Sequence, residues 1–214
     1  MTAASTSKGK APRQRVPASQ RRDALIEAAV EEFALGGLHG TPVDRIARRV
    51  GVAQPYVFSL FGSKRELFLA AVQRGFQLVA DTFTRAAATF DPADWEPGTD
   101  LLHVMGMAYV ELLSTHRKYL MLQHHAYAAC EDELIRERVR ACYAGLVTHV
   151  EQLSGAGPEQ IDEFFHYGMW LNVAAAMGVE DLSASCEWIR AAVPEPGADA
   201  EAAPDAEAAP GPAR

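Results

Sequence analysis

Apolar residues recur every three or four positions near the start of the chain. Between Ser19 and about Leu35 they fall at Leu25, Ile26, Ala29, Val30 and Phe33. This spacing is typical of one face of an amphipathic α-helix. Gly36 and Gly37 follow the pattern and are expected to end the helix.

A second helix is predicted from its start signal. In Thr41-Pro42-Val43-Asp44 we expect threonine at the N-cap, proline at the first helical position and a carboxylate in the first turn. Apolar residues then recur with helical spacing up to Gly51, where the helix should stop. They are Val43, Ile46, Ala47 and Val50.

Two more helices follow at once. Pro55 suits the first turn of a helix over residues 53–61 (AQPYVFSLF), where no backbone N–H is required. Ser63 and Glu66 have the spacing of a capping box, which predicts a longer helix to about Phe90.

The rest of the chain also reads as helical. Residues 91–98 are a loop by their Pro, Gly and Asp content, and helices are expected over about 99–116, 117–129, 131–153, 158–178 and 183–192. No segment shows sustained two-residue alternation, so the fold class is all-α. The basic residues 1–18 and the Pro/Ala/acidic residues 193–214 are expected to be disordered.

Composition narrows the class of protein. About half of the 214 residues are apolar and 22% are charged, which describes a soluble globular protein. The stretch 164–179 lacks formal charges but is too short to span a bilayer, so we expect no membrane segment. Three widely separated cysteines, Cys130, Cys142 and Cys186, indicate reduced thiols in the cytoplasm rather than a disulfide or metal framework.

Charge is divided unevenly along the chain. The net charge is −8, yet residues 1–75 hold twelve basic and six acidic residues. The N-terminal third is therefore positive, which suits contact with nucleic acid. From Lys8 to Arg22 the chain has six basic residues and no acidic one, and this segment is either a solubilising leader or an arm that touches phosphate or enters a minor groove.

The spacing of three residues predicts a helix-turn-helix. Ala47 is the small residue where two helices cross, Gly51 can adopt the positive φ of the turn, and Val57 anchors the second helix. A purely structural helical corner is the alternative. In the second helix, Ala53, Val57, Leu60 and Phe61 should face inward.

The outward face of residues 53–61 carries candidate DNA contacts. Pro55 and Ser59 point away from the core, flanked by Tyr56 and Phe58, and Gln54 lies at the helix start. Gln can pair with adenine, and hydroxyls can bond to bases or phosphates. This helix is uncharged, but it can still read bases because phosphate contacts can be made elsewhere. The candidates are Thr41, Arg45, Arg48, Lys64 and the basic N-terminal residues.

Residues 19–70 resemble the TetR family of bacterial transcriptional regulators, through "FALGGLHGTPVDRIARRVGV", "AQPYVF" and "LFGSKRELF". The resemblance implies a three-helix DNA-binding domain (19–70) joined to a larger helical effector-binding and dimerisation domain (71–192). It implies base contacts by Gln54, Pro55 and Tyr56 and phosphate contacts by Thr41 and Lys64. Phe58 and Leu60 depart from the family, which often has Tyr and His there.

Candidate effector residues are the pliable or aromatic side chains of the C-terminal helices, which suit an adaptable apolar pocket. They are His103, Met107, Tyr109, Gln123, His124, Tyr127, Tyr143, Phe165, Met169 and Asn172. The same residues at helical spacing also suit an ordinary core. Adjacent His124 and His125 diverge on a helix, so no metal or cofactor is expected.

The sequence therefore indicates a cytoplasmic homodimeric repressor that binds a palindromic operator in double-stranded DNA and responds to an unknown small-molecule effector. The resemblance implies that the helical hairpin 131–178 forms the dimer interface. One alternative is a regulator controlled by a protein partner. Another is an all-α enzyme or ligand-binding protein with a structural helix-turn-helix, although the sequence offers no catalytic set.

Overall fold

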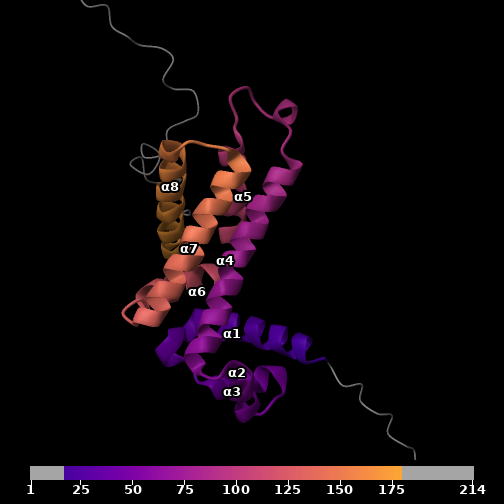
Figure 1. The fold of residues 1–214 in the computed structure, drawn as a ribbon, viewed down its shortest axis with the longest axis vertical. Helices are drawn as coiled ribbons and strands as arrows, with labels where there is room; N and C mark the ends of the chain where they lie inside the picture. Colours follow the sequence, from indigo (N-terminus) through magenta and orange to yellow (C-terminus); the bar gives the residue numbers. More distant parts are fainter. Residues whose placement is uncertain (1–16, 180–214) are drawn as a thin grey trace, which may run out of the picture. The chain divides into compact units, whose positions relative to one another are not determined.

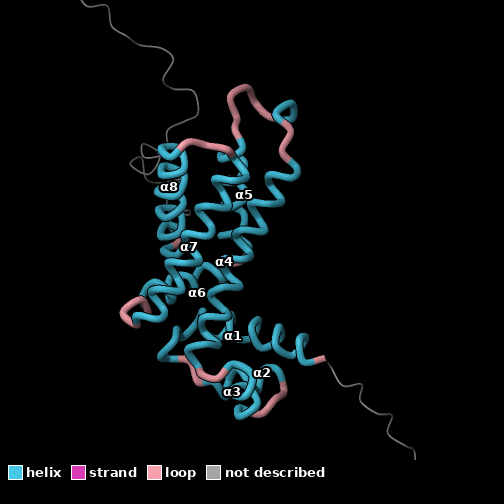
Figure 2. The backbone as a smooth tube through the Cα atoms, in the orientation of Figure 1, coloured by secondary structure: helices cyan, strands magenta, loops and turns pink. Residues whose placement is uncertain are grey.

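A computed structural model describes residues 17–179 of the protein. Within these residues the chain is all-helical and forms no strand (Figures 1 and 2), which confirms the predicted fold class. Three predicted features lie outside the described residues: most of the basic N-terminal segment, the helix over 183–192 and the acidic tail. Cys186 lies outside them as well.

The first three helices are α1 (Ala18–Gly40), α2 (Val43–Val50) and α3 (Gln54–Phe61). Helix α1 is bent at Gly37, whose φ of 61° is not helical, so the stop signal predicted at this point marks a kink. Phe33 of α1, Ile46 of α2 and Val57 of α3 are buried in one core. The Phe33 ring meets the Phe68 ring edge-on, with centroids 5.0 Å apart.

The turn between α2 and α3 depends on Gly51. This residue has φ 73° and ψ 34°, the left-handed conformation expected of it, and its N–H points to the carbonyls of Ala47 and Arg48. The N–H of Val52 donates to the Ala47 carbonyl at 3.0 Å. These bonds satisfy the carbonyls at the end of α2 and aim the chain into α3.

Two local predictions in this region are wrong. The N-cap of α2 is Pro42, which makes no side-chain capping bond, and Thr41 lies one residue before it. Ala53 is the N-cap of α3 and is exposed, so it does not contribute to the inward face. Thr41 and Ala53 both lie before the first residue of the helix to which they were assigned.

Helix α4 (Lys64–Thr89) begins as predicted. The Ser63 side chain accepts a hydrogen bond from the N–H of Glu66 at 3.1 Å, which caps the helix. A short 3₁₀ helix, η1 (Pro92–Asp94), lies in the expected loop. The remaining helices are α5 (Leu101–Thr115), α6 (Arg117–Ala128), α7 (Glu133–Ser154) and α8 (Pro158–Met177).

Helices α4 and α6 connect the N-terminal helices to the C-terminal ones. Helix α4 packs against α1 at one end and against α5 and α7 along the rest of its length, and α6 packs against α1. The described chain up to Ala176 clusters as one compact unit. The domain boundary predicted after residue 70 falls inside α4 and stays a prediction. Within residues 17–179, no helix has both the length and the apolarity needed to cross a membrane.

Replacing Gly51 by alanine should destabilise the fold. A Cβ at this position meets no atom within 4 Å, but the left-handed backbone disfavours any side chain. We expect Gly51→Ala to cost about 1–2 kcal/mol in the free energy of unfolding, measured by urea denaturation.

Gly145 is the matched control, because it lies inside α7 and a Cβ there also meets open space. Gly145→Ala should stabilise the protein by about 0.5–1 kcal/mol, since alanine is the better helix former. Equal effects of the two substitutions would contradict the assigned role of the Gly51 conformation.

Candidate nucleic-acid interface

The surface of α3 gathers four of the predicted DNA-binding residues. Pro55 and Ser59 are exposed, whereas Gln54 and Tyr56 are half-buried. The Ser59 hydroxyl donates to the Tyr56 carbonyl at 2.8 Å. Beneath them Val57 and Phe61 are buried, so α3 has one face in the core and one free to meet a base edge.

Lys64 lies at the N-terminus of α4, next in the chain after α3. Its Nζ donates to the carbonyl of His39 at 3.2 Å, which holds the ammonium near the end of α1. Partial burial lowers the pKa of Lys64 below its usual value. The ammonium has further N–H groups, so this single bond leaves donors for another acceptor.

Thr41 has a different position from the one expected. Its side chain is buried, and its hydroxyl donates to the carbonyl of Glu32 at 3.0 Å. The hydroxyl is therefore used inside the protein and is not presented to a phosphate. The start-of-helix pattern placed Thr41 at a solvent-facing cap, but the bond to α1 turns it inward.

The arginines of α2 are all engaged with acidic side chains. Arg48 pairs with Asp44 on its own helix at 2.9 Å. Arg45 and Arg49 instead reach across to Glu32 on α1, with N–O distances of 3.5 and 3.1 Å. These three cations are thus positioned by ion pairs rather than being free.

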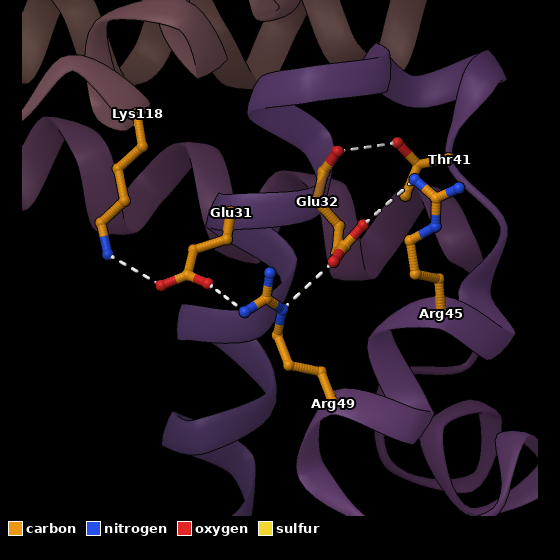
Figure 3. A network of polar contacts seen from close by, with 6 residues as sticks. All are labelled: Glu31, Glu32, Thr41, Arg45, Arg49 and Lys118. Atoms are coloured by element: carbon orange, nitrogen blue, oxygen red, sulfur yellow. Dashed lines mark hydrogen bonds and ion pairs between the residues drawn. The ribbon is translucent and has the colours of Figure 1, made fainter.

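Glu32 is the residue that sequence reasoning missed. Its side chain is only 6% exposed, and it accepts from two guanidinium groups (Figure 3). A signal existed in the sequence, because position 32 lies three and four residues after Ala29 and Ala28 on the buried side of α1. A buried carboxylate on that face requires a cationic partner, and α2 supplies two, Arg45 and Arg49.

The C-terminal helices bring together a second group of predicted residues. Asn172 of α8 is 1% exposed and donates through Nδ2 to the hydroxyl of Tyr109 on α5 at 2.7 Å. The Oδ1 atom of Asn172 is buried and has no hydrogen-bond partner among residues 17–179. His124 Nε2 of α6 lies 3.2 Å from the Asn172 carbonyl.

Further predicted residues extend this group. Gln123 donates to the hydroxyl of Tyr127, which in turn lies 3.8 Å from the sulfur of Met169. The rings of Tyr143 and Phe165 meet at 5.5 Å. We call the eight residues the polar core cluster: Tyr109, Gln123, His124, Tyr127, Tyr143, Phe165, Met169 and Asn172. His103 and Met107 are exposed and do not join it.

A narrow cavity lies beside the polar core cluster, between α4, α5 and α6. It is lined mainly by apolar side chains such as Phe76, Val79 and Leu113, together with Tyr109 and Gln123. Its free volume of about 20 Å³ is enough for a single water molecule. In the described part of the chain, no three His, Cys, Asp or Glu side chains gather into a metal site.

The tyrosines of the cluster are held in the neutral form. Burial raises the pKa of Tyr109, and the neighbouring Tyr127 and Tyr143 raise it further. Burial also raises the pKa of Tyr127 to about 12. These hydroxyls therefore remain hydrogen-bond donors throughout the physiological range.

Comparisons with known proteins agree with this geometry. Residues 25–71 match the family described as bacterial regulatory proteins, tetR family. The activator FasR of Mycolicibacterium smegmatis is 45% identical over 60 residues, which are 28% of this chain and 27% of FasR. The repressor SCO4008 of Streptomyces coelicolor is 33% identical over 89 residues, 42% of this chain and 44% of the relative. The matched segments thus span less than half of either relative.

The fold as a whole is similar to a solved structure. The fatty acid degradation regulator FadR from Bacillus halodurans superimposes with a TM-score of 0.60, covering 83% of this chain and 92% of that one. The sequence identity is 16%, so this likeness concerns the fold alone.

The buried tyrosines predict a loss of stability in alkali. A raised folded pKa means that the unfolded chain releases the phenolic proton first, so stability is full below about pH 10 and falls as the pH rises further. Each tyrosine contributes at most about 1.4 kcal/mol per pH unit. Tyr127→Phe should flatten the decline in the free energy of unfolding, measured by urea denaturation from pH 8 to 11. An unchanged slope would contradict the burial of this hydroxyl.

Proposed function

We propose that this chain is a transcriptional regulator that binds double-stranded DNA through α2 and α3, a proposal supported by the match of residues 25–71 to the tetR family of bacterial regulatory proteins. In its fuller form the proposal is a cytoplasmic, homodimeric repressor that recognises a palindromic operator and is released by a small molecule. One relative is named as an activator and another as a repressor, so the two names support regulation of transcription but not repression in particular. Both names describe regulators, and we propose no enzymatic activity.

The observation that carries the DNA-binding proposal is the exposed side of α3. Gln54, Pro55, Tyr56 and Ser59 lie on one short helix whose opposite face is fixed in the core. A helix of this kind can enter the major groove, where an amide or hydroxyl reads a base edge. Because α3 carries no charged side chain, we propose that α3 contacts the bases and that neighbouring groups bind the phosphates.

Phosphate contacts are proposed for Lys64 and for the backbone at helix N-termini. Lys64 stands at the start of α4, where unpaired N–H groups and the helix dipole favour an anion. Arg45 and Arg48 are about half or more exposed at the side chain, with values of 56% and 73%, and can add positive potential. Thr41 is withdrawn as a side-chain contact because its hydroxyl is buried.

Dimerisation is proposed through α7 and α8. Helix α8 exposes three large side chains in succession at helical spacing: Tyr167, Trp170 and Val173 are 43%, 39% and 45% exposed. The rings of Tyr167 and Trp170 stack with centroids 6.0 Å apart. Exposed apolar side chains gathered on one helix face are typical of a partner-binding surface. A two-fold dimer would present two copies of α3 to half-sites about 34–36 Å apart.

The effector is proposed to act at the polar core cluster. Its aromatic and methionine side chains provide an adaptable apolar wall, and the Oδ1 of Asn172 can accept a hydrogen bond from a ligand. The effector would bind one spacing of the two DNA-binding heads better than the other, with α4 as the connecting lever. Regulation by a protein partner is the second candidate, favoured by the small size of the existing cavity.

The test begins with the full-length protein and a pool of random duplexes. Repeated selection should enrich an inverted repeat, and a footprint should cover both half-sites. Failure to enrich any sequence at low salt would contradict DNA-binding regulation. A library of small molecules, screened by thermal shift and then by release from the selected duplex, separates the two modes of regulation. If the screen finds no compound that both stabilises the protein and releases it from DNA, regulation by a protein partner is favoured.

Gln54→Ala should relax sequence preference. Loss of a bidentate contact is expected to cost about 1–3 kcal/mol of discrimination at one base pair of each half-site, with little change at the others. Affinities for single-base variants of the selected duplex, measured by fluorescence anisotropy, check this expectation. Equal losses on all sequences would mean that Gln54 does not read a base.

Lys64→Ala should weaken binding equally on every sequence. Removing one phosphate contact lowers the slope of log affinity against log salt by about 0.9 for each Lys64 that contacts DNA. Lys64→Arg is the matched control, because it keeps the positive charge. A slope unchanged by Lys64→Ala would place the ammonium away from the DNA.

A further inference from the structure

We propose that Glu31 and Glu32 form a carboxylate junction, through which Lys118 of α6 sets the DNA affinity of α2 and α3 without touching DNA. The two carboxylates are the positioning residues of this junction, and Arg45, Arg49 and Lys118 are its cationic partners (Figure 3). The inference rests on the DNA-binding function proposed above.

The first link fixes α2 on α1. Glu32 is buried and bonds to Arg49 Nε at 3.1 Å and to Arg45 Nη1 at 3.5 Å. Its backbone carbonyl also accepts from the Thr41 hydroxyl at 3.0 Å, at the entrance to α2. A buried carboxylate that loses its partners is left uncompensated at a high energetic cost. The orientation of α2, and of α3 packed on it, is therefore tied to Glu32.

The second link passes from α2 to α6. Glu31 accepts from Arg49 Nη1 at 2.7 Å through one oxygen and from Lys118 Nζ at 3.3 Å through the other. Arg49 thus bridges both carboxylates, and Glu31 bridges α2 and α6. The side chains of Glu31, Arg49 and Lys118 are between about a third and a half exposed, so each ion pair alone contributes little to stability. The two pairs share the carboxylate of Glu31, which couples them.

The third link runs through α6 itself. Beside Lys118, Tyr119 donates to Glu27 of α1 at 2.7 Å. Farther along α6, His125 packs so closely on Gly37 that a Cβ there would come within 2.8 Å of its Nδ1. Other side chains of the same helix, among them Gln123 and Tyr127, belong to the polar core cluster. Helix α6 therefore contacts both α1 and the polar core cluster.

These links give Lys118 a defined electrostatic effect. Its ammonium offsets part of the charge of Glu31, which limits how strongly the two carboxylates retain Arg49. Without Lys118, the uncompensated carboxylate draws Arg49 more firmly toward α1 and adds negative potential near the DNA-binding face. Both consequences oppose binding to a polyanion, although Lys118 lies on α6 and not on the helix-turn-helix.

A double-mutant cycle tests the junction. The full-length protein is compared with Lys118→Met, with Glu31→Gln and with the double variant, using the duplex selected by the wild type. Lys118→Met should weaken binding by about two- to fivefold, the range of a partly exposed ion pair. The same change made in the Glu31→Gln background should alter the affinity by less than about 1.5-fold, because the carboxylate on which Lys118 acts is gone.

Two controls separate this mechanism from general effects. Arg117→Met removes the same charge one residue away, from a guanidinium that bonds to the carbonyls of Ala175 and Ala176 on α8, and should leave the affinity within about 1.5-fold of the wild type. Lys118→Arg should restore wild-type affinity, since it keeps the cation. Melting temperatures and circular dichroism establish that each variant is folded.

The outcomes are distinguishable. A loss caused by Lys118→Met that persists in the Glu31→Gln background would overturn the junction, and so would no loss in either background. An equal loss from Arg117→Met would assign the effect to net charge instead. A wild-type protein that selects no duplex would contradict the proposed function itself and this inference with it.

Discussion

The buried carboxylate of Glu32 constrains the N-terminal half of this molecule. A charge in that position is tolerated only when paired, and its partners Arg45 and Arg49 both lie on α2. Helix α2 is therefore held to α1 by polar contacts as well as by the core around Ile46. Gly51 fixes the angle between α2 and α3. The orientation of the α3 face that carries Gln54 and Tyr56 therefore also depends on Glu32.

Helix α6 connects the Glu31–Glu32 region of α1 to the C-terminal helices. Lys118 and His125 contact α1, while Gln123, His124 and Tyr127 contribute to a buried polar cluster with α5 and α8. A short helix with partners on both sides transmits displacement because packed interfaces shift as units rather than deform smoothly. The narrow cavity is therefore lined in part by α6, the helix that packs on α1, and α1 in turn holds the proposed DNA-binding helix α2.

Local sequence signals predicted the helix-turn-helix well. Gly51 has the predicted left-handed conformation, Ser63 caps α4, and Val57 and Phe61 are buried. The failures occurred at helix ends. Thr41 has the composition of a cap, yet its hydroxyl bonds to Glu32 of another helix. Eight of the ten candidate effector residues meet in one cluster, whereas His103 and Met107 are exposed, because periodicity identifies a helical face but not its neighbour.

The sequence by itself determined the all-helical class, the positions of the turns and the neutral character of α3, since each follows from residues close together in the chain. Only the tertiary structure decided which charged side chains are paired inside the protein. The pairing of Arg45 and Arg49 with Glu32, and of Lys118 with Glu31, joins positions separated by 13 to 87 residues. Such pairs depend on how helices pack, and the spacing of residues within a single helix identifies its buried face but not the helix that covers it.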